Sequence, residues 1–169
     1  MKAERKAERT EVLTHGLVAG VLGYAVVVVF YAVWNALQGR SPFFTAALLG
    51  EAAFYGLDEP SEVTVWAGPV LAFNGLHLTV FLIVGMIAAW IATQSERGAQ
   101  FWYVGVSLFI YGMIHVLGLV LWLAAPLRVE MPVWSALVVT VLALGGMSLY
   151  LLEVHPRLRL ELREYEEDA

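Results

Sequence analysis

Four long, uninterrupted apolar runs dominate the sequence. They cover residues 12–37, 69–92, 101–125 and 133–152, and none of them contains Asp, Glu, Lys or Arg. A helix needs about 20 mostly apolar residues to cross the ~30 Å hydrocarbon core of a bilayer. The runs are continuous rather than alternating, which is typical of transmembrane helices and not of barrel strands. The pattern therefore predicts an all-α, polytopic membrane protein, built as an antiparallel bundle of four transmembrane helices.

The connections between the runs differ in length and polarity. Residues 94–100 and 126–132 form short connections, so we expect the second, third and fourth spans to be antiparallel neighbours. Residues 41–57 are apolar but too short to span, and we expect them to form a short interfacial helix on the outer surface. No linker or change of composition divides the chain, which predicts a single membrane domain over residues 1–169.

The positive charges predict the orientation of the bundle, because the cytoplasmic side of a membrane protein carries an excess of Lys and Arg. Only Arg40 and Arg128 fall on the side of the first and third connections. Both termini, with the tail over residues 153–169, are therefore expected in the cytoplasm, and the protein in the cell membrane. The other basic residues fall on the side of the termini: Lys2, Arg5, Lys6, Arg9, Arg97, Arg157, Arg159 and Arg163.

The composition agrees with this interpretation and excludes several classes of function. Of the 169 residues, 60% are apolar and 15% are charged, against about 45–50% and about 25% in a soluble domain. The net charge is −5 and the chain has no cysteine. These values exclude a soluble enzyme, a nucleic-acid binder, a disulfide and a cysteine-ligated metal. The expected partners are the lipid bilayer and other membrane protein subunits.

Two histidines lie inside the predicted spans, where an ionisable side chain is a functional-site hypothesis by default. His77 lies 8 residues into the second span, and His115 lies 10 residues before the end of the third. At 1.5 Å per residue, both are about 12–15 Å below the outer boundary. Imidazole is a common ligand of metals and of haem iron. The sequence therefore predicts a b-type haem, or another metal, between His77 and His115.

Neighbouring residues fit a haem pocket, although each also has a simpler interpretation. Asn74 lies one turn before His77, where its amide could orient the imidazole or meet a propionate. Gly112 and Gly118 share the helical face of His115 and would leave room beside it. The alternative is that the histidines only form hydrogen bonds between helices, and that the glycines only allow close helix packing.

Three further features lie near the predicted membrane boundaries. His15 and His155 form a second, weaker candidate pair for haem at the cytoplasmic end, with plain hydration as the alternative. Glu51 is expected to face water from the interfacial helix, or else to exchange protons or pair with Arg40. The Gly16-x-x-x-Gly20 pattern predicts a close helix contact in the bundle or with another subunit.

The sequence contains no catalytic constellation, so it does not predict an enzyme. The favoured function is a small integral membrane subunit or accessory protein of a larger membrane complex, with a respiratory or electron-transfer complex as the candidate assembly and haem b between His77 and His115 as the candidate cofactor. One alternative is a structural four-helix membrane protein without a cofactor. Another is a transporter or proton-conducting protein, which is disfavoured because the spans hold no charged residue.

Overall fold

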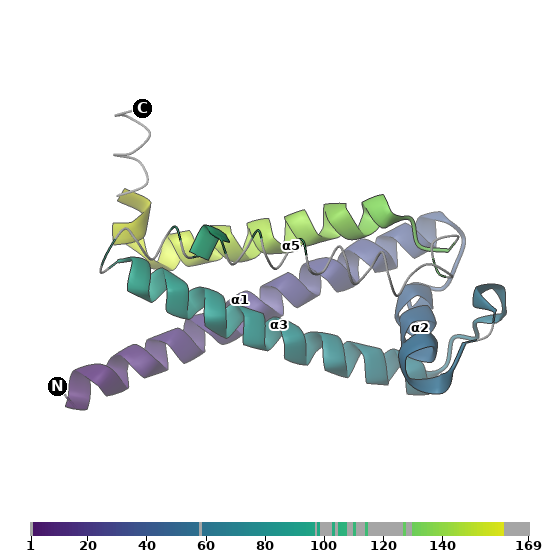
Figure 1. Cartoon of the computed structure of the whole chain (residues 1–169). Helices are drawn as coiled ribbons and strands as arrows, with labels where there is room; N and C mark the ends of the chain where they lie inside the picture. Colours follow the sequence, from purple (N-terminus) through teal and green to yellow (C-terminus); the bar gives the residue numbers. More distant parts are fainter. Residues whose placement is uncertain are drawn as a thin grey trace.

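A computed structural model describes residues 2–57, 59–96, 98, 103, 105–107, 110, 114, 127 and 130–160. These residues form helices and connecting turns, and no strand occurs among them. Figure 1 shows the long helices side by side, with the start of α1 and the end of α5 at the same end of the molecule. The elements are α1 (Lys2–Leu37), α2 (Phe44–Gly50), a π-helix (Glu51–Tyr55), a 3-10 helix (Pro60–Glu62), α3 (Ala67–Ser95) and α5 (Val133–Val154).

Three helices are long and apolar enough to cross a membrane. They cover Arg9–Leu37, Ala67–Ser95 and Val133–Val154, in close agreement with the first, second and fourth apolar runs. Of the third run, the structure describes residues 103, 105–107, 110 and 114, all helical. The rest of that run lies outside the described residues, so the count of four spans stays a prediction. His115, Gly112 and Gly118 are among the residues outside the description.

Local signals in the sequence fix where the long helices begin and end. The chain leaves α1 through Gly39, whose φ of +72° is a left-handed conformation that glycine adopts without strain. Pro69 lies in the first turn of α3, where its missing N–H costs nothing. Helix α5 begins after Pro132 and ends at Val154, with His155 as its C-cap. Pro156 follows this C-cap, as is common just after the end of a helix.

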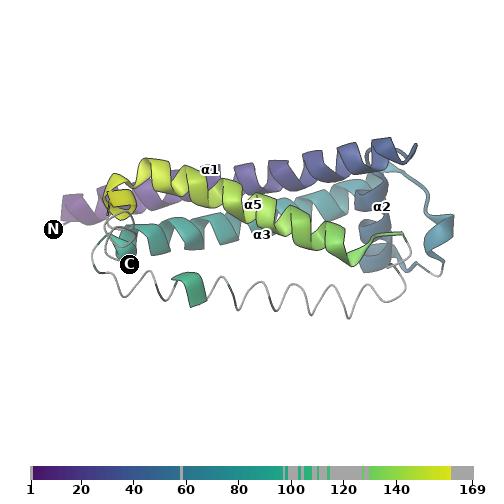
Figure 2. The same cartoon turned by 90° about the horizontal axis from the view of Figure 1, so that it is seen from above.

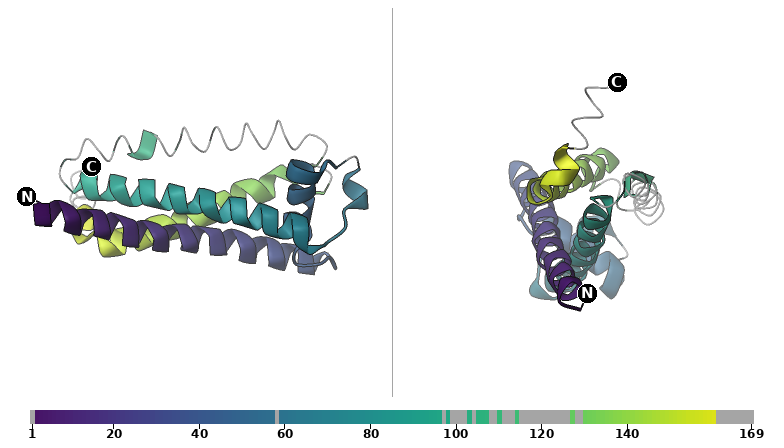
Figure 3. Two further views of the ribbon diagram at one scale, coloured as in Figure 1. Left: turned by 90° about the horizontal axis from the view of Figure 1, so that it is seen from below. Right: turned by 90° about the vertical axis from the view of Figure 1, so that its left-hand side faces the viewer.

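Helix α1 packs against both α3 and α5, whereas α3 and α5 make few contacts with each other. The end-on view in Figure 3 shows α1 lying beside the other two long helices. The short connections in the sequence led us to expect neighbours among the later spans, but they gave no position for α1. In the structure, the first predicted span (α1) therefore packs against both the second (α3) and the fourth (α5).

Glycines bring α1 and α3 into close contact. A Cβ atom at Gly16 would lie 2.6 Å from Cα of Met86, and one at Gly20 would lie 2.6 Å from the carbonyl oxygen of Phe81. On the facing helix, a Cβ at Gly85 would collide with the backbone of both Gly16 and Gly20. The close contact predicted from Gly16-x-x-x-Gly20 is thus confirmed, and it lies within the chain.

Larger side chains fill the interface between α1 and α5. Val27, Val139 and Ala143 form a buried cluster between these helices. A second cluster joins Ala19 of α1, Ala89 of α3, and Met147 and Leu151 of α5. The two clusters place the packed core along α1, and Figure 2 shows α5 crossing over α1 and α3.

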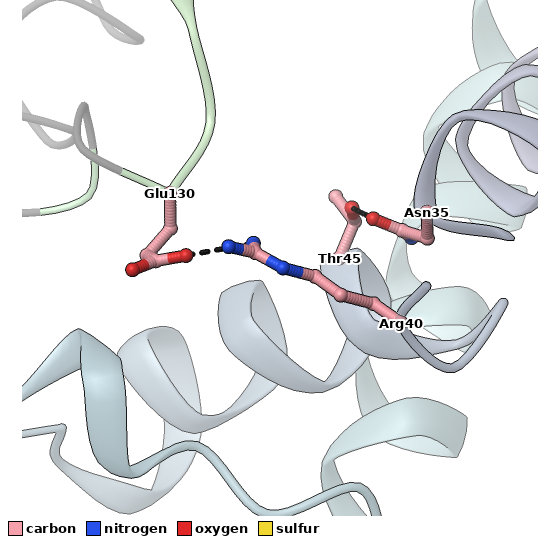
Figure 4. A network of polar contacts seen from close by, with 4 residues as sticks. All are labelled: Asn35, Arg40, Thr45 and Glu130. Carbon is pink, nitrogen blue, oxygen red and sulfur yellow. Dashed lines mark hydrogen bonds and ion pairs between the residues drawn. The ribbon is translucent and has the colours of Figure 1, made fainter. Parts of the chain in front are cut away.

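Polar contacts join the helices at the end of the molecule where α2 lies. We call this end the α2 end. Asn35 is 2% exposed and exchanges two hydrogen bonds with Thr45, at 3.0 and 3.1 Å. Arg40 forms an ion pair of 2.7 Å with Glu130 and stacks 4.7 Å above the Phe44 ring. Figure 4 shows how these contacts tie the end of α1 to α2 and to the turn before α5.

The segment over residues 41–57 is helical, as predicted, from Phe44 to Tyr55. Glu51 at the start of its π-helix accepts hydrogen bonds from Thr64 (3.3 Å) and Trp66 (3.2 Å). The suggested pairing of Glu51 with Arg40 is wrong, because Arg40 pairs with Glu130. Glu51 instead fixes the chain that leads into α3.

Candidate functional site

The space between α3 and α5, with α1 behind it, forms a cavity of about 1200 Å³. Its size exceeds the about 300–1,000 Å³ of a usual small-molecule site. It extends from Pro42 and Leu49 at the α2 end to Leu151 and Leu158 at the opposite end, which we call the His155 end. Most of the described lining is aliphatic or aromatic. The polar residues in it are Tyr24, Tyr31, Thr45, Asn74, His77, Ser95, Thr140 and Ser148.

His77 lies on the wall of this cavity among aromatic rings. The Phe73 ring stacks against the imidazole, with 5.0 Å between centroids and 25° between planes. Phe81 lies 5.1 Å away and Tyr24 of α1 lies 6.4 Å away. Atom Nε2 of His77 is buried, and among the described residues it has no hydrogen-bond partner. Such a buried polar atom is costly unless something binds it.

The helical repeat of α3 explains how His77 reaches this position. Phe73, His77, Phe81 and Gly85 are spaced four residues apart and lie on one stripe of the helix. Gly85 is the residue of α3 that touches α1 most closely. His77 therefore lies on the same face of α3 as Gly85, about two turns closer to the start of the helix. At this level of the helix the close contact with α1 ends and the cavity begins.

Asn74 forms a hydrogen-bonded pair with a residue that sequence reasoning missed. The Tyr24 hydroxyl donates to Oδ1 of Asn74 at 2.9 Å, and Nδ2 of Asn74 donates to the carbonyl of Val70 at 2.8 Å. Tyr24 alone gave no sign of this role. A usable signal existed, because Gly16, Gly20 and Tyr24 repeat every four residues, which places Tyr24 on the face that contacts α3.

The structure brings His15 and His155 together at the His155 end. Their rings lie 6.0 Å apart in an edge-on arrangement, and Nδ1 of His15 lies 2.9 Å from the Tyr150 hydroxyl. His155 is 2% exposed, which contradicts the alternative that it is simply hydrated. Its Nδ1 lies 2.9 Å from the Leu151 carbonyl and its Nε2 lies 3.4 Å from the Thr93 hydroxyl. An iron ligand here would have to give up one of these contacts.

Within the described part of the chain, no group of three or more His, Cys, Asp or Glu residues could hold a metal ion. A single imidazole on an apolar wall suits a different class of ligand. It can bind the iron of a haem through one nitrogen, or it can form one hydrogen bond with a largely apolar molecule.

Comparison with models of known protein families, with curated proteins and with solved structures finds no match for this chain. The functional argument therefore depends on the geometry of the cavity and its polar groups.

Proposed function

We propose that the chain is a small integral membrane subunit of a larger assembly and holds a b-type haem, with His77 as one axial ligand. The observation that carries the proposal is the buried Nε2 atom of His77, which has no hydrogen-bond partner among the described residues. The His77 side chain is part of the lining of a cavity large enough for a sizeable ligand. A ligand atom bound to Nε2 would remove the cost of leaving it unpaired.

The second axial ligand in this proposal is His115, which the sequence places at the depth of His77 on the next span. His115 lies outside the described residues, so its role follows from the spacing alone. When bound, the haem would supply one-electron chemistry within the membrane. The protein would supply the axial nitrogens and the aromatic surroundings.

The test is the absorption spectrum of the full chain, purified in mild detergent and titrated with haem. The wild-type chain is expected to give the Soret band of a low-spin, bis-histidine haem. His77→Ala is expected to lose that band, and His115→Ala is expected to lose it or to change its spin state. The matched control is His15→Ala, which removes an imidazole outside the cavity and should keep the band. A wild-type chain without a Soret band contradicts the proposal, and so does an unchanged band in His77→Ala.

We further propose that both termini lie in the cytoplasm and that α2 lies at the outer surface. The support is the distribution of basic residues, together with the position of α1's start and α5's end at one end of the molecule. Because the chain has no cysteine, a single one can be labelled selectively. An impermeant thiol reagent added outside intact cells should label Ala53→Cys and spare Glu153→Cys. The reverse pattern contradicts this orientation.

A further inference from the structure

The described wall of the cavity is uncharged, although it contains several polar side chains. No Asp, Glu, Lys or Arg occurs among its described residues. Placing an unpaired charge against such a wall is unfavourable, because no described residue of the wall supplies a counter-charge. The part of a ligand that lies deep in this cavity should therefore be neutral.

Most hydroxyl hydrogens on this wall are already used. Thr140 and Ser95 each donate to a carbonyl one turn earlier in their own helix, at 2.7 and 2.9 Å. The hydroxyl of Tyr24 donates to Asn74. The amide of Asn74 and the ring of His77 remain, one turn apart on α3, and so does the Ser148 hydroxyl on α5. Two groups that can reach a ligand thus lie next to each other on α3.

Two contacts fix the orientation of the Asn74 amide. Its Oδ1 accepts from the Tyr24 hydroxyl, and its Nδ2 donates to the carbonyl of Val70. A flipped amide would point its oxygen at the Val70 carbonyl, so only one orientation satisfies both partners. The amide nitrogen carries two hydrogens, and one of them has no acceptor within the described part of the structure. Asn74 therefore presents a fixed, unused N–H group on the cavity wall.

We propose that Asn74 donates this hydrogen to a carbonyl oxygen of a prenylated quinone, a flat and neutral molecule with a long apolar tail. A quinone carbonyl is an uncharged acceptor, which suits an uncharged wall with a free donor. On α3 the lining continues from Asn74 to Ser95, a helix length of about 32 Å at 1.5 Å per residue. This apolar stretch fits the tail. Because this stretch passes His77, a quinone here and a haem on His77 would occupy the same cavity in turn.

Two probes separate recognition of the carbonyl from burial of the tail. One is a benzoquinone with a decyl tail, and the other is decylbenzene, which has the same tail and no carbonyl. Both are titrated into the full chain in detergent micelles by calorimetry. The infrared carbonyl band of the quinone is recorded in the same samples. The wild-type chain should bind the quinone more tightly than decylbenzene and should shift the carbonyl band to lower frequency than in empty micelles.

Variants of Asn74 and Tyr24 test whether Asn74 donates the hydrogen bond to the quinone carbonyl. Asn74→Leu keeps the side-chain size and removes the N–H, so it should weaken quinone binding about 2- to 10-fold and return the band to its micelle position. Decylbenzene binding should not change. Tyr24→Phe frees the amide to rotate and should cause a smaller change in the same direction. The matched control is Thr79→Val, since Thr79 donates to the Gly75 carbonyl of its own helix, and it should behave as wild type.

The proposal is overturned if the wild-type chain binds the two probes equally, or if Asn74→Leu leaves the carbonyl band shifted. If Asn74→Leu also loses decylbenzene binding, its cavity has collapsed, and Tyr24→Phe becomes the deciding variant. A quinone carbonyl band in Tyr24→Phe at the same frequency as in wild type then overturns the proposal. His77→Ala separates the two ligands, because it should abolish haem binding and retain the shifted carbonyl band. Failure of the haem proposal and failure of the quinone proposal are therefore distinguishable.

Discussion

The two faces of α3 are built in opposite ways. The face toward α1 is closed by backbone-to-backbone contact, with Gly85 against Gly16 and Gly20. Among the described residues, the face toward α5 is the open one, because α3 and α5 make few contacts and both border a cavity of about 1200 Å³, which Gly105 and Val106 of the third apolar run also line. The closed face holds the helices in register. His77 lies on the stripe of Gly85, at the point where the closed contact gives way to the cavity.

The comparison of the two faces shows that glycines outside the cavity lining can fix the position of α3, and with it the position of His77. The glycines bring α3 close to α1, whereas the described residues of α3 and α5 make few contacts with each other. Among the described residues, the Thr93–His155 contact at 3.4 Å is the one hydrogen bond that joins α3 to α5 or its C-cap. The four predictions below test the closed face, the α2 end and the open face.

The largest effect is expected from Gly85→Ala on the closed face. The new Cβ would collide with the backbone of Gly16 and Gly20, so the helices would have to separate. We expect a loss of about 1–3 kcal/mol in the free energy of unfolding, measured by steric trapping in detergent. The control is Gly75→Ala on the same helix, where a Cβ meets nothing within 4 Å. Equal effects of the two substitutions would contradict the close contact.

The next effect is expected at the α2 end, from Asn35→Ala. Thr45 is 6% exposed and would lose its side-chain partner without gaining access to water. Leaving a buried hydroxyl unsatisfied costs about 1–3 kcal/mol. The same unfolding assay measures this loss. Asn35→Ala in a Thr45→Val background should cost less than in wild type, and strictly additive effects would show that the pair does not interact.

A smaller effect is expected from Thr93→Val, which removes the hydrogen bond between α3 and the end of α5. Hydrogen bonds between helices in membranes are worth about 0.6 kcal/mol on average, and the distance of 3.4 Å suits a weak one. Spin labels on cysteines introduced at Gln94 and Glu153 should show a broader distance distribution in Thr93→Val. A distribution that is unchanged in width would mean that this contact does not hold the two helices together.

The smallest effect on stability is expected from Val84→Phe on the open face. Val84 is the sequence neighbour of Gly85 but lines the cavity, so the added ring points into the space that the described residues leave there. We expect a change in unfolding free energy within about 0.5 kcal/mol, together with weaker ligand binding. A loss as large as that of Gly85→Ala would mean that the cavity is not open in the folded protein.

The sequence predicted the elements of this fold better than their arrangement. Apolar runs alone placed the membrane-length parts of α1, α3 and α5 to within three residues at each end, because a run of hydrophobic residues fixes a helix without reference to its neighbours. The Gly16-x-x-x-Gly20 pattern correctly indicated a close contact, but it carries no information about its partner. Gly85 is an isolated glycine in the sequence, and only its position opposite that pattern reveals its role.

The candidate site was predicted in part for the same reason. His77 stood out because a lone imidazole in an apolar run is rare, and the structure shows it on the wall of a cavity. Tyr24 did not stand out, since a tyrosine in a span has many uses and its partner Asn74 is 50 residues away. The proximity of His15 to His155 was expected from their common depth, whereas the burial of His155 depends on how α5 ends against α1 and α3.

The most direct test of the account is the haem content of the full chain purified from haem-replete cells, measured as haem per chain after extraction. We predict close to one haem per chain in the wild type and in His15→Ala, and none in His77→Ala. A wild-type chain without haem, both as purified and after incubation with haem, would contradict the assignment of His77 as an axial ligand.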